Sequence, residues 1–303
     1  MLYRGPTGRS QVEADALMAA MSTPEGAAGA AKAAPAILVV EDLVKRFTTA
    51  DGVLSAVDHV SFSVAPGEFV AVIGPSGCGK STLFNMIGGL IDADEGRVRV
   101  ADERVNGPHP AIGMMFQEES TFPWRTVIDN VAFPLEIAGV RKAERYARAR
   151  HFVALVGLDG FERRYPAELS GGMRQRVSMA RTLAASPKIL LMDEPFASLD
   201  EQTRLLLGDK VLQIQQGLRQ TTLLITHNIT EAVQLSDRVL VMTYRPGRLK
   251  RSITIDLPRP RSSEVVSSDE FGRYVAQIWG DLREEASRGL REEEQHLERS
   301  GAP

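Results

Sequence analysis

Residues 74–81, which read GPSGCGKS, have the composition of a loop that binds a phosphate chain. Glycines let the backbone curl so that successive N–H groups face phosphate oxygens, and a helix expected at residues 81–90 presents its positive end to the same anion. Lys80 would bring a full positive charge to the β and γ phosphates, and the Ser81 hydroxyl could hold Mg²⁺. The segment matches GxxxxGK[ST], and it predicts nucleotide contacts from one continuous set of residues. That set is Gly74, Pro75, Ser76, Gly77, Cys78, Gly79, Lys80, Ser81 and Thr82.

A second group of candidate residues stands where an apolar run, residues 189–193, ends in the carboxylates Asp193 and Glu194. A buried strand would deliver Asp193 rigidly toward a metal ion, as enzymes with such a phosphate loop require. Glu194 follows where the chain leaves the sheet. It could therefore face an attacking water and act as a general base, a role typically worth ~10²–10⁴-fold in rate. The alternative is a carboxylate pair that simply begins a surface loop.

A third group lies in residues 169–177, which read LSGGMRQRV. Ser170, Gly171 and Gly172 stand at the expected start of a helix, which creates a second anion site separate from the first. A glycine-capped helix start would explain these three residues alone, but not the whole string in this order. The string resembles LSGGQ, the signature of the ABC transporter ATPases. Met173 departs from that signature, in which Gln is usual, so a glutamine contact is lost.

The resemblance covers residues 36–261 and implies how the two anion sites work together. In this family two copies of the chain pair head to tail. Each ATP is then held by Lys80 of one copy and by Ser170 of the other. A second copy of the chain is therefore an expected partner, and ATP and Mg²⁺ are the expected cofactors.

The resemblance also implies the ligands of the metal. Gln117, within the string MMFQE, would reach the Mg²⁺ and link the nucleotide core to a helical insertion. Ser81 and Asp193 complete the expected set. Most glutamines are surface residues, so the order of this one after Lys80 carries the interpretation.

Three further positions match the family in order. His227, in ITHN, would contact the γ-phosphate and orient the water together with Glu194. Asp200, in ASLD, would communicate across the dimer. Phe47 would stack on adenine, for which any aromatic face suffices, although a core Phe on the first strand is the alternative. Lys80, Glu194 and His227 are therefore the expected catalytic residues.

Three short segments indicate a transporter partner. The sequences PWRTV, RPGR and LPRPR, at residues 123–127, 245–248 and 257–261, resemble the importer ATPases for nitrate, sulfonate and taurine. Glu119 departs from that group, in which a small residue or Pro is usual. The resemblance implies an integral membrane permease as a partner, an extracytoplasmic solute-binding protein as an indirect one, and uptake of a small anion as the function.

Two other functions share much of this chemistry. An export or lipid-handling ABC system would use an identical cassette, although residues 123–124 disfavour it. A soluble ABC ATPase that acts on DNA or ribosomes would need a long insertion or a second cassette. Only about 50 positions separate Gln117 from Ser170, and the chain has one phosphate loop.

These residues need a framework that brings several loops to one edge of a sheet. Apolar and β-branched runs predict strands at residues 37–47, 53–64, 68–73, 97–101, 189–193, 222–226 and 239–243. Helical patterns between residues 122 and 167 predict an insertion. The expected fold is α/β. The resemblance implies a P-loop NTPase core with a RecA-like mixed sheet and an antiparallel β subdomain, plus an inserted helical subdomain at about residues 118–185.

The ends of the chain differ from this domain. Residues 1–35 are rich in Ala and Gly and are expected to form a disordered leader. Residues 36–261 are the expected ABC ATPase domain, with residues 257–261 as a linker. Residues 262–303 are expected to form a helical extension, because apolar residues recur at helical spacing there. Those residues are Phe271, Tyr274, Val275, Ile278, Trp279 and Leu282.

Composition narrows the setting of the protein. The 303 residues carry a net charge of −3, which offers nothing to favour nucleic acid as a partner. A single cysteine, Cys78, excludes a disulfide within the chain and fits a reducing compartment. No run approaches the about 20 apolar residues of a spanning helix. With a permease as partner, the expected location is the cytoplasmic face of the inner membrane, as a peripheral protein.

Overall fold

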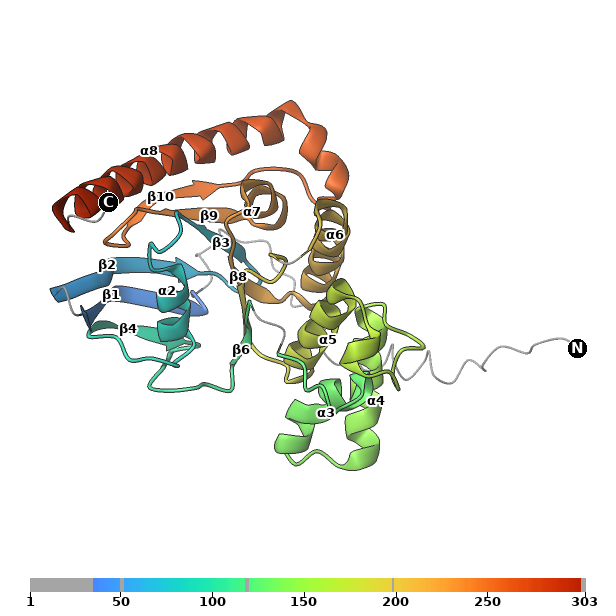
Figure 1. Cartoon of the computed structure of the whole chain (residues 1–303). Coiled ribbons are helices and arrows are strands. Elements are labelled where there is room, and N and C mark those ends of the chain that lie inside the picture. The colour runs from blue at the N-terminus through green and yellow to red at the C-terminus, as the bar shows by residue number, and fades with distance from the viewer. Residues whose placement is uncertain (1–34, 50–51, 118–119, 198, 301–303) are drawn as a thin grey trace, which may run out of the picture. The chain divides into compact units, whose positions relative to one another are not determined.

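The computed structural model describes residues 35–49, 52–117, 120–197 and 199–300, with side chains described as far as residue 292. The expected leader lies outside the described residues except for Pro35, and Glu119 lies outside them as well. The described chain folds into two β-sheets and the helices that cover them (Figure 1).

The smaller sheet is antiparallel, with the strand order β2-β1-β4-β5. Its strands are β1 (Leu38–Thr49), β2 (Gly52–Val64), β4 (Glu95–Val100) and β5 (Glu103–Arg104). Buried Leu38 and Val40 alternate with more exposed neighbours, as expected for a sheet that has one face on a core. The register pairs Phe47 of β1 with Leu54 of β2, near the end of β1 and the beginning of β2.

The larger sheet has six strands in the order β10-β9-β3-β8-β7-β6. They are β3 (Phe69–Ile73), β6 (Ile112–Met115), β7 (Ile189–Asp193), β8 (Thr221–Ile225), β9 (Arg238–Met242) and β10 (Leu249–Thr254). Every neighbouring pair is parallel except β9 with β10. Strands β3 and β8 are buried along their whole length, which explains their continuous apolar character. The expected α/β class, with a mixed sheet and an antiparallel β subdomain, is confirmed.

Parallel strands bring several loops to one place. Strands β3, β7 and β8 are neighbours and run in the same direction, so their carboxyl ends lie at one edge of the sheet. Loops that leave this edge are where ligands bind in open α/β sheets.

Helix α2 (Lys80–Ile87) packs between the two sheets. Its buried residues Leu83 and Phe84 belong to one cluster with Leu38 of the smaller sheet and Val70 of the larger one. This packing holds the beginning of α2 in a constant relation to the end of β3 and to strands β1 and β2.

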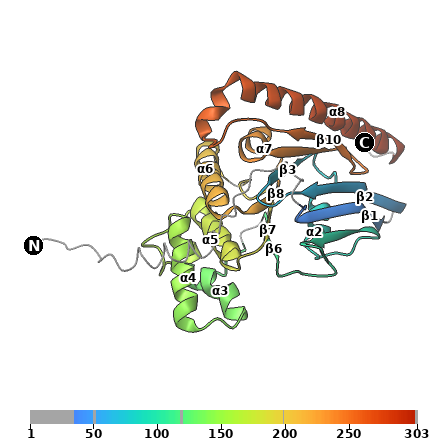
Figure 2. The same cartoon turned by 180° about the vertical axis from the view of Figure 1, so that it is seen from behind.

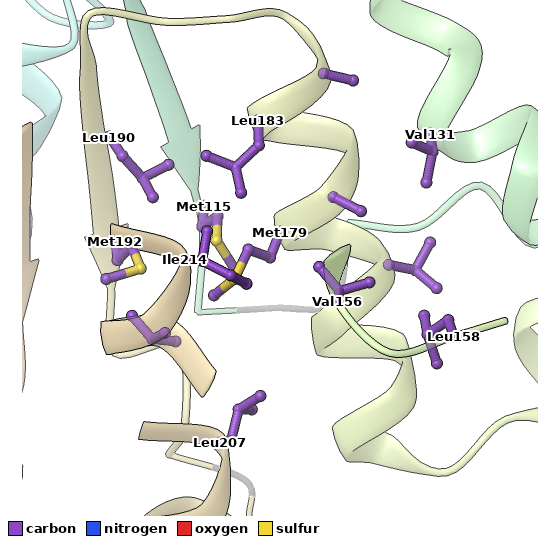
Figure 3. Close-up of a cluster of buried hydrophobic side chains, with 14 of the residues drawn as sticks. Met115, Val131, Val156, Leu158, Met179, Leu183, Leu190, Met192, Leu207 and Ile214 are labelled. Atoms are coloured by element: carbon purple, nitrogen blue, oxygen red, sulfur yellow. The ribbon is translucent and has the colours of Figure 1, made fainter. Parts of the chain in front are cut away.

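A second core lies on the other face of the larger sheet. Figure 3 shows Met179 and Leu183 of α5 (Gly171–Ala184) directed toward Met115 of β6 and Leu190 of β7. Ile214 of α6 (Glu201–Leu218) completes this part of the cluster (Figure 3). The core therefore ties α5 and α6 to the strands whose ends carry the candidate carboxylates.

The inserted helices form a separate layer. Helices α3 (Val127–Ile137) and α4 (Lys142–Leu155) pack on α5, away from the antiparallel sheet (Figure 2). A short 3₁₀ turn, Pro166–Glu168, precedes α5. Thr126 caps α3 by accepting a hydrogen bond from Asp129 N at 3.3 Å. Pro134 lies inside α3 and does not prevent the helix from forming.

The remaining helices cover the edge of the larger sheet that carries β9 and β10. Helix α7 (Ile229–Leu235) follows β8, and a 3₁₀ turn, Ser263–Ser267, leads into the long helix α8 (Asp269–Ser300). Figure 1 shows α8 running across β10 and α7. Of the expected stripe on α8, Phe271 and Ile278 are buried and Trp279 is not. Among the described residues, no helix has both the length and the apolar character that crossing a bilayer needs.

Residues 257–261 were expected to be a linker, but they pack against the domain. Leu257 and Arg261 are buried, and the Arg261 guanidinium donates hydrogen bonds to the carbonyls of Ser236, Ile255 and Leu257. These backbone acceptors satisfy a charged group that a linker would leave in water. Burial lowers the pKa of Arg261 to about 10.

Candidate active site

The loop between β3 and α2 is shaped by glycine. Gly79, the residue before α2, has φ +98°, and no side chain caps the helix. A Cβ at Gly79 would lie 2.3 Å from the Ala56 carbonyl oxygen, so the position has neither the backbone freedom nor the space for another residue. The first N–H groups of α2 are consequently available to an anion.

Lys80 lies inside this loop. Its side chain is buried, and Nζ donates to the carbonyl oxygens of Gly74 and Pro75, at 2.8 Å in each case. These neutral acceptors keep the ammonium directed into the curl of the loop. A phosphate oxygen in the same place would be a stronger acceptor, because a hydrogen bond between charged groups is roughly twice as strong.

A cleft of about 420 Å³ extends from this loop to the antiparallel sheet. The residues that line it are Phe47, Leu54, Ala56, Ser76, Gly77, Gly79, Lys80, Ser81, Thr82, Gln117 and Glu194. Phe47 is 40% exposed, which excludes the alternative of a core Phe. Leu54 and Ala56 were not predicted from the sequence. Their position follows from the register, which places Leu54 opposite Phe47.

Asp193 ends β7 beneath the same loop. Its Oδ1 atom is buried and has no hydrogen-bond partner. Burial raises the pKa of this carboxyl, while a hydrogen bond with Ser81 and the charge of Lys80 oppose the rise. A partnerless buried carboxylate oxygen beside a hydroxyl is the kind of donor set that Mg²⁺ prefers, so these residues fit the ion.

The Glu194 carboxylate lies close to two other predicted residues. Its Oε2 atom lies 3.1 Å from Nδ1 of His227 and 3.5 Å from Nε2 of Gln117. The backbone at Glu194 is left-handed, with φ +45°, and its N–H donates to the Ile225 carbonyl at 2.9 Å. The turn therefore directs the carboxylate out of the sheet and toward the cleft. A non-glycine residue in this conformation is uncommon and marks a site held in place by its surroundings.

A buried carboxyl group, Glu231, is bonded to Thr226, the residue that precedes His227. The Thr226 hydroxyl donates to Glu231 and also accepts from the N–H of Asn228, at 3.0 Å for the latter. Burial raises the pKa of Glu231 to about 7, against the opposing effects of Thr226 and Arg204. The sequence analysis did not identify Glu231, since one Glu near the start of a helix has no distinguishing pattern.

The signature residues lie elsewhere. Ser170 caps α5, which begins at Gly171, and its Oγ accepts from Met173 N at 3.3 Å. Ser170 and Gly172 border a different cavity, of about 460 Å³, together with Arg176, Thr203, Leu206, Leu207 and Lys210. None of these residues lines the cleft at the phosphate loop. Asp200 caps α6 by accepting from Thr203 N at 2.9 Å.

Three residues of the predicted phosphate-binding segment 74–82 do not line the cleft. Gly74 and Pro75 contact Lys80 through their carbonyl oxygens. The Cys78 side chain is fully buried, and burial raises the pKa of its thiol. The structure therefore places these residues within the wall of the loop.

Comparison with known proteins identifies the family. The family model described as "ABC transporter" matches residues 57–197. An uncharacterised ABC transporter ATP-binding protein of Methanocaldococcus jannaschii is 47% identical over 254 residues, which are 84% of this chain and 94% of the relative. A nitrate import ATP-binding protein of Synechocystis sp. is 42% identical, in a match that covers 81% of this chain and 95% of the relative. An aliphatic sulfonates import ATP-binding protein of Bacillus cereus is 40% identical, covering 78% and 94%.

Solved structures agree with these relatives. A dimeric structure of an ATP-binding cassette in a post-hydrolysis state, bound to ADP and Pi, superposes with a TM-score of 0.64 at 28% identity. The match covers 73% of this chain and 100% of that one. An ABC transporter subunit from Clostridium perfringens has a TM-score of 0.67 at 26% identity. This match covers 79% of this chain and 94% of that one. The chain belongs to the family of ABC transporter ATP-binding proteins, which are ATPases.

Proposed function

We propose that the chain hydrolyses Mg-ATP in a head-to-tail dimer and that the dimer drives uptake of a small anion through a membrane permease. The observation that carries the proposal is the separation of two candidate phosphate sites in one chain. The phosphate loop and the signature helix border different cavities. A second copy, turned by a twofold axis, would bring one site of each kind to each nucleotide.

The phosphate loop of one copy binds ATP. Phe47 offers its exposed ring to the adenine, and the N–H groups of the loop and of α2 receive the phosphates. Lys80 exchanges its two carbonyl acceptors for phosphate oxygens. Thr82, the second residue after Lys80, lines the cleft beside them.

Three residues would hold Mg²⁺, namely Ser81, Gln117 and Asp193. When bound, the ion neutralises charge on the β and γ phosphates. A hydrogen bond with Ser81 acts to lower the pKa of the Asp193 carboxyl, and Ser81 and Gln117 both line the cleft.

Glu194 and His227 act on the attacking water. The carboxylate of Glu194 accepts the water proton, and His227, 3.1 Å away, orients the carboxylate and contacts the γ-phosphate. Ser170, Gly171 and Gly172 of the second copy add N–H groups and a hydroxyl on the opposite side, where the oxyanion charge develops. Asp200 of that copy communicates between the two sites. Loss of the bridging phosphate after cleavage reopens the dimer.

The helical subdomain provides the contact with the permease. The strand β6 ends two residues before Gln117, and the loop that follows carries an aromatic group, Phe122 and Trp124, with ring centroids 5.6 Å apart. Trp124 is 72% exposed. The side chain of Asn130 fixes this loop through hydrogen bonds with Phe122 and Arg125, so a partner would meet a surface that is held in place, a few residues along the chain from Gln117 of the cleft.

The relatives supply the proposed direction and substrate class. Proteins named for nitrate import and for aliphatic sulfonate import match more than three quarters of this chain. We infer that the chain serves uptake of a small anion such as nitrate, a sulfonate or taurine. It would do so at the cytoplasmic face of the inner membrane, with an extracytoplasmic binding protein that it does not touch.

Replacing Glu194 by Gln tests the catalytic proposal. The amide keeps the shape of the side chain but cannot accept a proton, so turnover should fall ~10²–10⁴-fold while Mg-ATP binding remains. Light scattering should then detect a dimer that accumulates with Mg-ATP and disperses with Mg-ADP. Near-normal turnover would remove Glu194 from the base role, and a variant that stays monomeric with Mg-ATP and its permease would contradict the dimer.

Growth tests the proposed direction of transport. Cells whose own copy carries Lys80→Ala should lose growth when nitrate, an alkanesulfonate or taurine is the only source of nitrogen or sulfur. Restoring Lys80 should restore growth on the same compound. Normal growth on all of them, together with a new sensitivity to an exported compound, would reverse the direction that we propose.

A further inference from the structure

The turn at residues 243–248 connects β9 with β10 and contacts the phosphate loop. The turn is closed by hydrogen bonds, from Thr243 N to the Arg248 carbonyl at 2.9 Å and from Thr243 Oγ1 to the Pro246 carbonyl at 2.8 Å. This is the RPGR segment of the sequence, to which neither the cleft nor the catalytic proposal assigns a role. Because these hydrogen bonds close the turn, we expect a displacement of one end of the turn to move its other end as well.

On one side, the turn holds the tip of the phosphate loop. The Arg245 side chain donates from Nε to the Gly77 carbonyl oxygen at 3.1 Å. Gly77 has φ +71°, and a Cβ there would lie 2.9 Å from Nη2 of Arg245, so the guanidinium packs directly against the loop. Gly247 approaches so closely that a Cβ on it would lie 2.1 Å from the Cys78 carbonyl oxygen.

This contact determines the orientation of one peptide group of the loop. The peptide between Gly77 and Cys78 is planar, and its C=O and N–H point in opposite directions. When Arg245 holds the carbonyl on the outside of the loop, the N–H of Cys78 must face the inside. There it lies 3.4 Å from the Pro75 carbonyl, a long hydrogen bond that an anion could replace.

On the other side, the turn is held by α8. Glu285 is only 3% exposed, and its Oε2 accepts from the N–H of Tyr244 at 3.0 Å. Its Oε1 accepts from Nζ of Lys250 at 2.8 Å. One helical turn further on, Gly289 lies against the Tyr244 ring, since a Cβ there would be 2.8 Å from the ring edge. Hydrogen bonds from Tyr244 and Lys250 lower the pKa of Glu285 against the effect of burial, so the carboxylate remains charged.

We propose that Arg245 is a positioning residue for the phosphate loop and that α8 sets its place through Glu285, so that the C-terminal helix controls how tightly the loop holds nucleotide. This inference rests on the proposed function, in which that loop binds Mg-ATP. A molecule that moved α8 away from Tyr244 would weaken nucleotide binding without touching the cleft.

Calorimetry with Mg-ADP on the full chain tests the role of Arg245. ADP is used because it does not need the second copy, so the measurement isolates the grip of one loop. Arg245→Ala should raise the Kd about three- to tenfold, the range expected for one hydrogen bond of this kind. Arg245→Lys should recover part of the loss. The matched control is Arg248→Ala, which removes an exposed arginine from the same turn that pairs with Asp58 instead, and it should leave the Kd unchanged.

Steady-state hydrolysis separates positioning from chemistry. For Arg245→Ala, the KM for ATP should rise by the same factor as the Kd, while kcat stays within about twofold of the unaltered chain, because ground-state binding alone is lost. A large fall in kcat with an unchanged KM would overturn the assignment.

A double substitution tests the contribution of α8. Glu285→Ala should raise the Kd for Mg-ADP about two- to fivefold, and combining it with Arg245→Ala should add nothing further, because both act through one contact. Gly289→Ala, which pushes on the Tyr244 ring without removing a charge, provides a second perturbation in case Glu285→Ala does not fold. Additive effects of Glu285→Ala, or a Gly289→Ala variant that folds and binds normally, would overturn the role of α8.

The unaltered chain distinguishes the two levels of the proposal. If it binds Mg-ADP normally and Arg245→Ala binds equally well, the inference fails and the proposed function stands. If the unaltered chain binds neither Mg-ADP nor Mg-ATP, the proposed function fails and this inference fails with it.

Discussion

Two helices of this chain begin with glycine-rich segments, yet their first turns are prepared differently. Helix α2 follows Gly79, whose backbone is left-handed and which offers no side-chain cap. Helix α5 follows Ser170, which is extended and whose own hydroxyl accepts from Met173 N. No side chain caps the first helix start, whereas in the second the Ser170 hydroxyl already bonds one of the N–H groups. A single copy should therefore bind nucleotide through α2 alone, with α5 contributing only when two copies close.

The largest difference between the two helix starts should come from adding one methyl group to each. Gly79→Ala requires a left-handed backbone at a non-glycine residue and places Cβ 2.3 Å from the Ala56 carbonyl, which should cost about 3 kcal/mol of unfolding free energy. At Gly172 the nearest atom to a new Cβ is Cγ2 of Thr203, at 3.2 Å, so Gly172→Ala should change stability by less than about 1 kcal/mol. Urea unfolding measures both variants, and equal losses would contradict the comparison.

Nucleotide affinity of a single copy should separate the same two helix starts. Lys80→Ala removes a charged donor from the phosphates and should weaken Mg-ADP binding roughly 10- to 100-fold. Ser170→Ala should leave that affinity unchanged and lower ATP turnover instead. Calorimetry with Mg-ADP provides the test. A comparable loss of affinity in both variants would mean that the signature helix contacts nucleotide within one copy.

Solution pH should affect stability through the buried carboxyl group of Glu231, which is bonded to Thr226 beside His227. The pKa of Glu231 rises from its ordinary value to about 7 on folding, so the folded state binds the proton more strongly than the unfolded state between about pH 4.5 and 7. Stability should therefore be greatest below this window and fall by about 2 kcal/mol between pH 5 and 8. Glu231→Gln should remove this part of the pH dependence, because its amide stays neutral. An unchanged pH profile in that variant would show that another group is responsible.

The smallest predicted effect concerns the cap of α5. Ser170→Ala deletes the acceptor for Met173 N and should cost about 0.5–1 kcal/mol, with faster hydrogen exchange in the first turn of the helix. Ser170→Asn should keep the cap, since Asn is an equally good N-cap residue. If Ser170→Ala exchanges no faster than Ser170→Asn, the hydroxyl contributes nothing as a cap.

In the larger sheet, the inner strands were predictable from sequence, and the two edge strands, β6 and β10, were not. The run at residues 189–193 matches β7 residue for residue. Strand β6 (Ile112–Met115) escaped prediction because it has four residues and includes Gly113, where Pro187 and Thr182 lie too close for a side chain. Strand β10 (Leu249–Thr254) escaped because, as an edge strand with one buried residue, it carries mostly charged and polar side chains.

Site residues were predictable where a motif specifies chemistry and unpredictable where long-range packing does. Asp193, Glu194 and His227 were named from their motifs. The structure places Glu194 in the wall of the cleft, with His227 and Asp193 next to it. Glu231 was not named, because its significance lies in burial and in a hydrogen bond with Thr226, and neither leaves a pattern in the sequence. Arg245 was noted only as part of a motif, since its contact with Gly77 depends on the pairing of β3 with β9.

The chain has two tryptophans, Trp124 on the loop before α3 and Trp279 on α8, and both rings reach solvent, at 72% and 58% exposure. Their fluorescence should therefore be quenched readily by iodide in the isolated protein. Replacing either one by Phe leaves a single emitter. The remaining indole then reports on one surface alone, shifting to the blue when a permease covers Trp124 and staying unshifted when only Trp279 is left. The protein thus carries its own pair of optical probes, one on the loop that we propose faces the permease and one on the C-terminal helix.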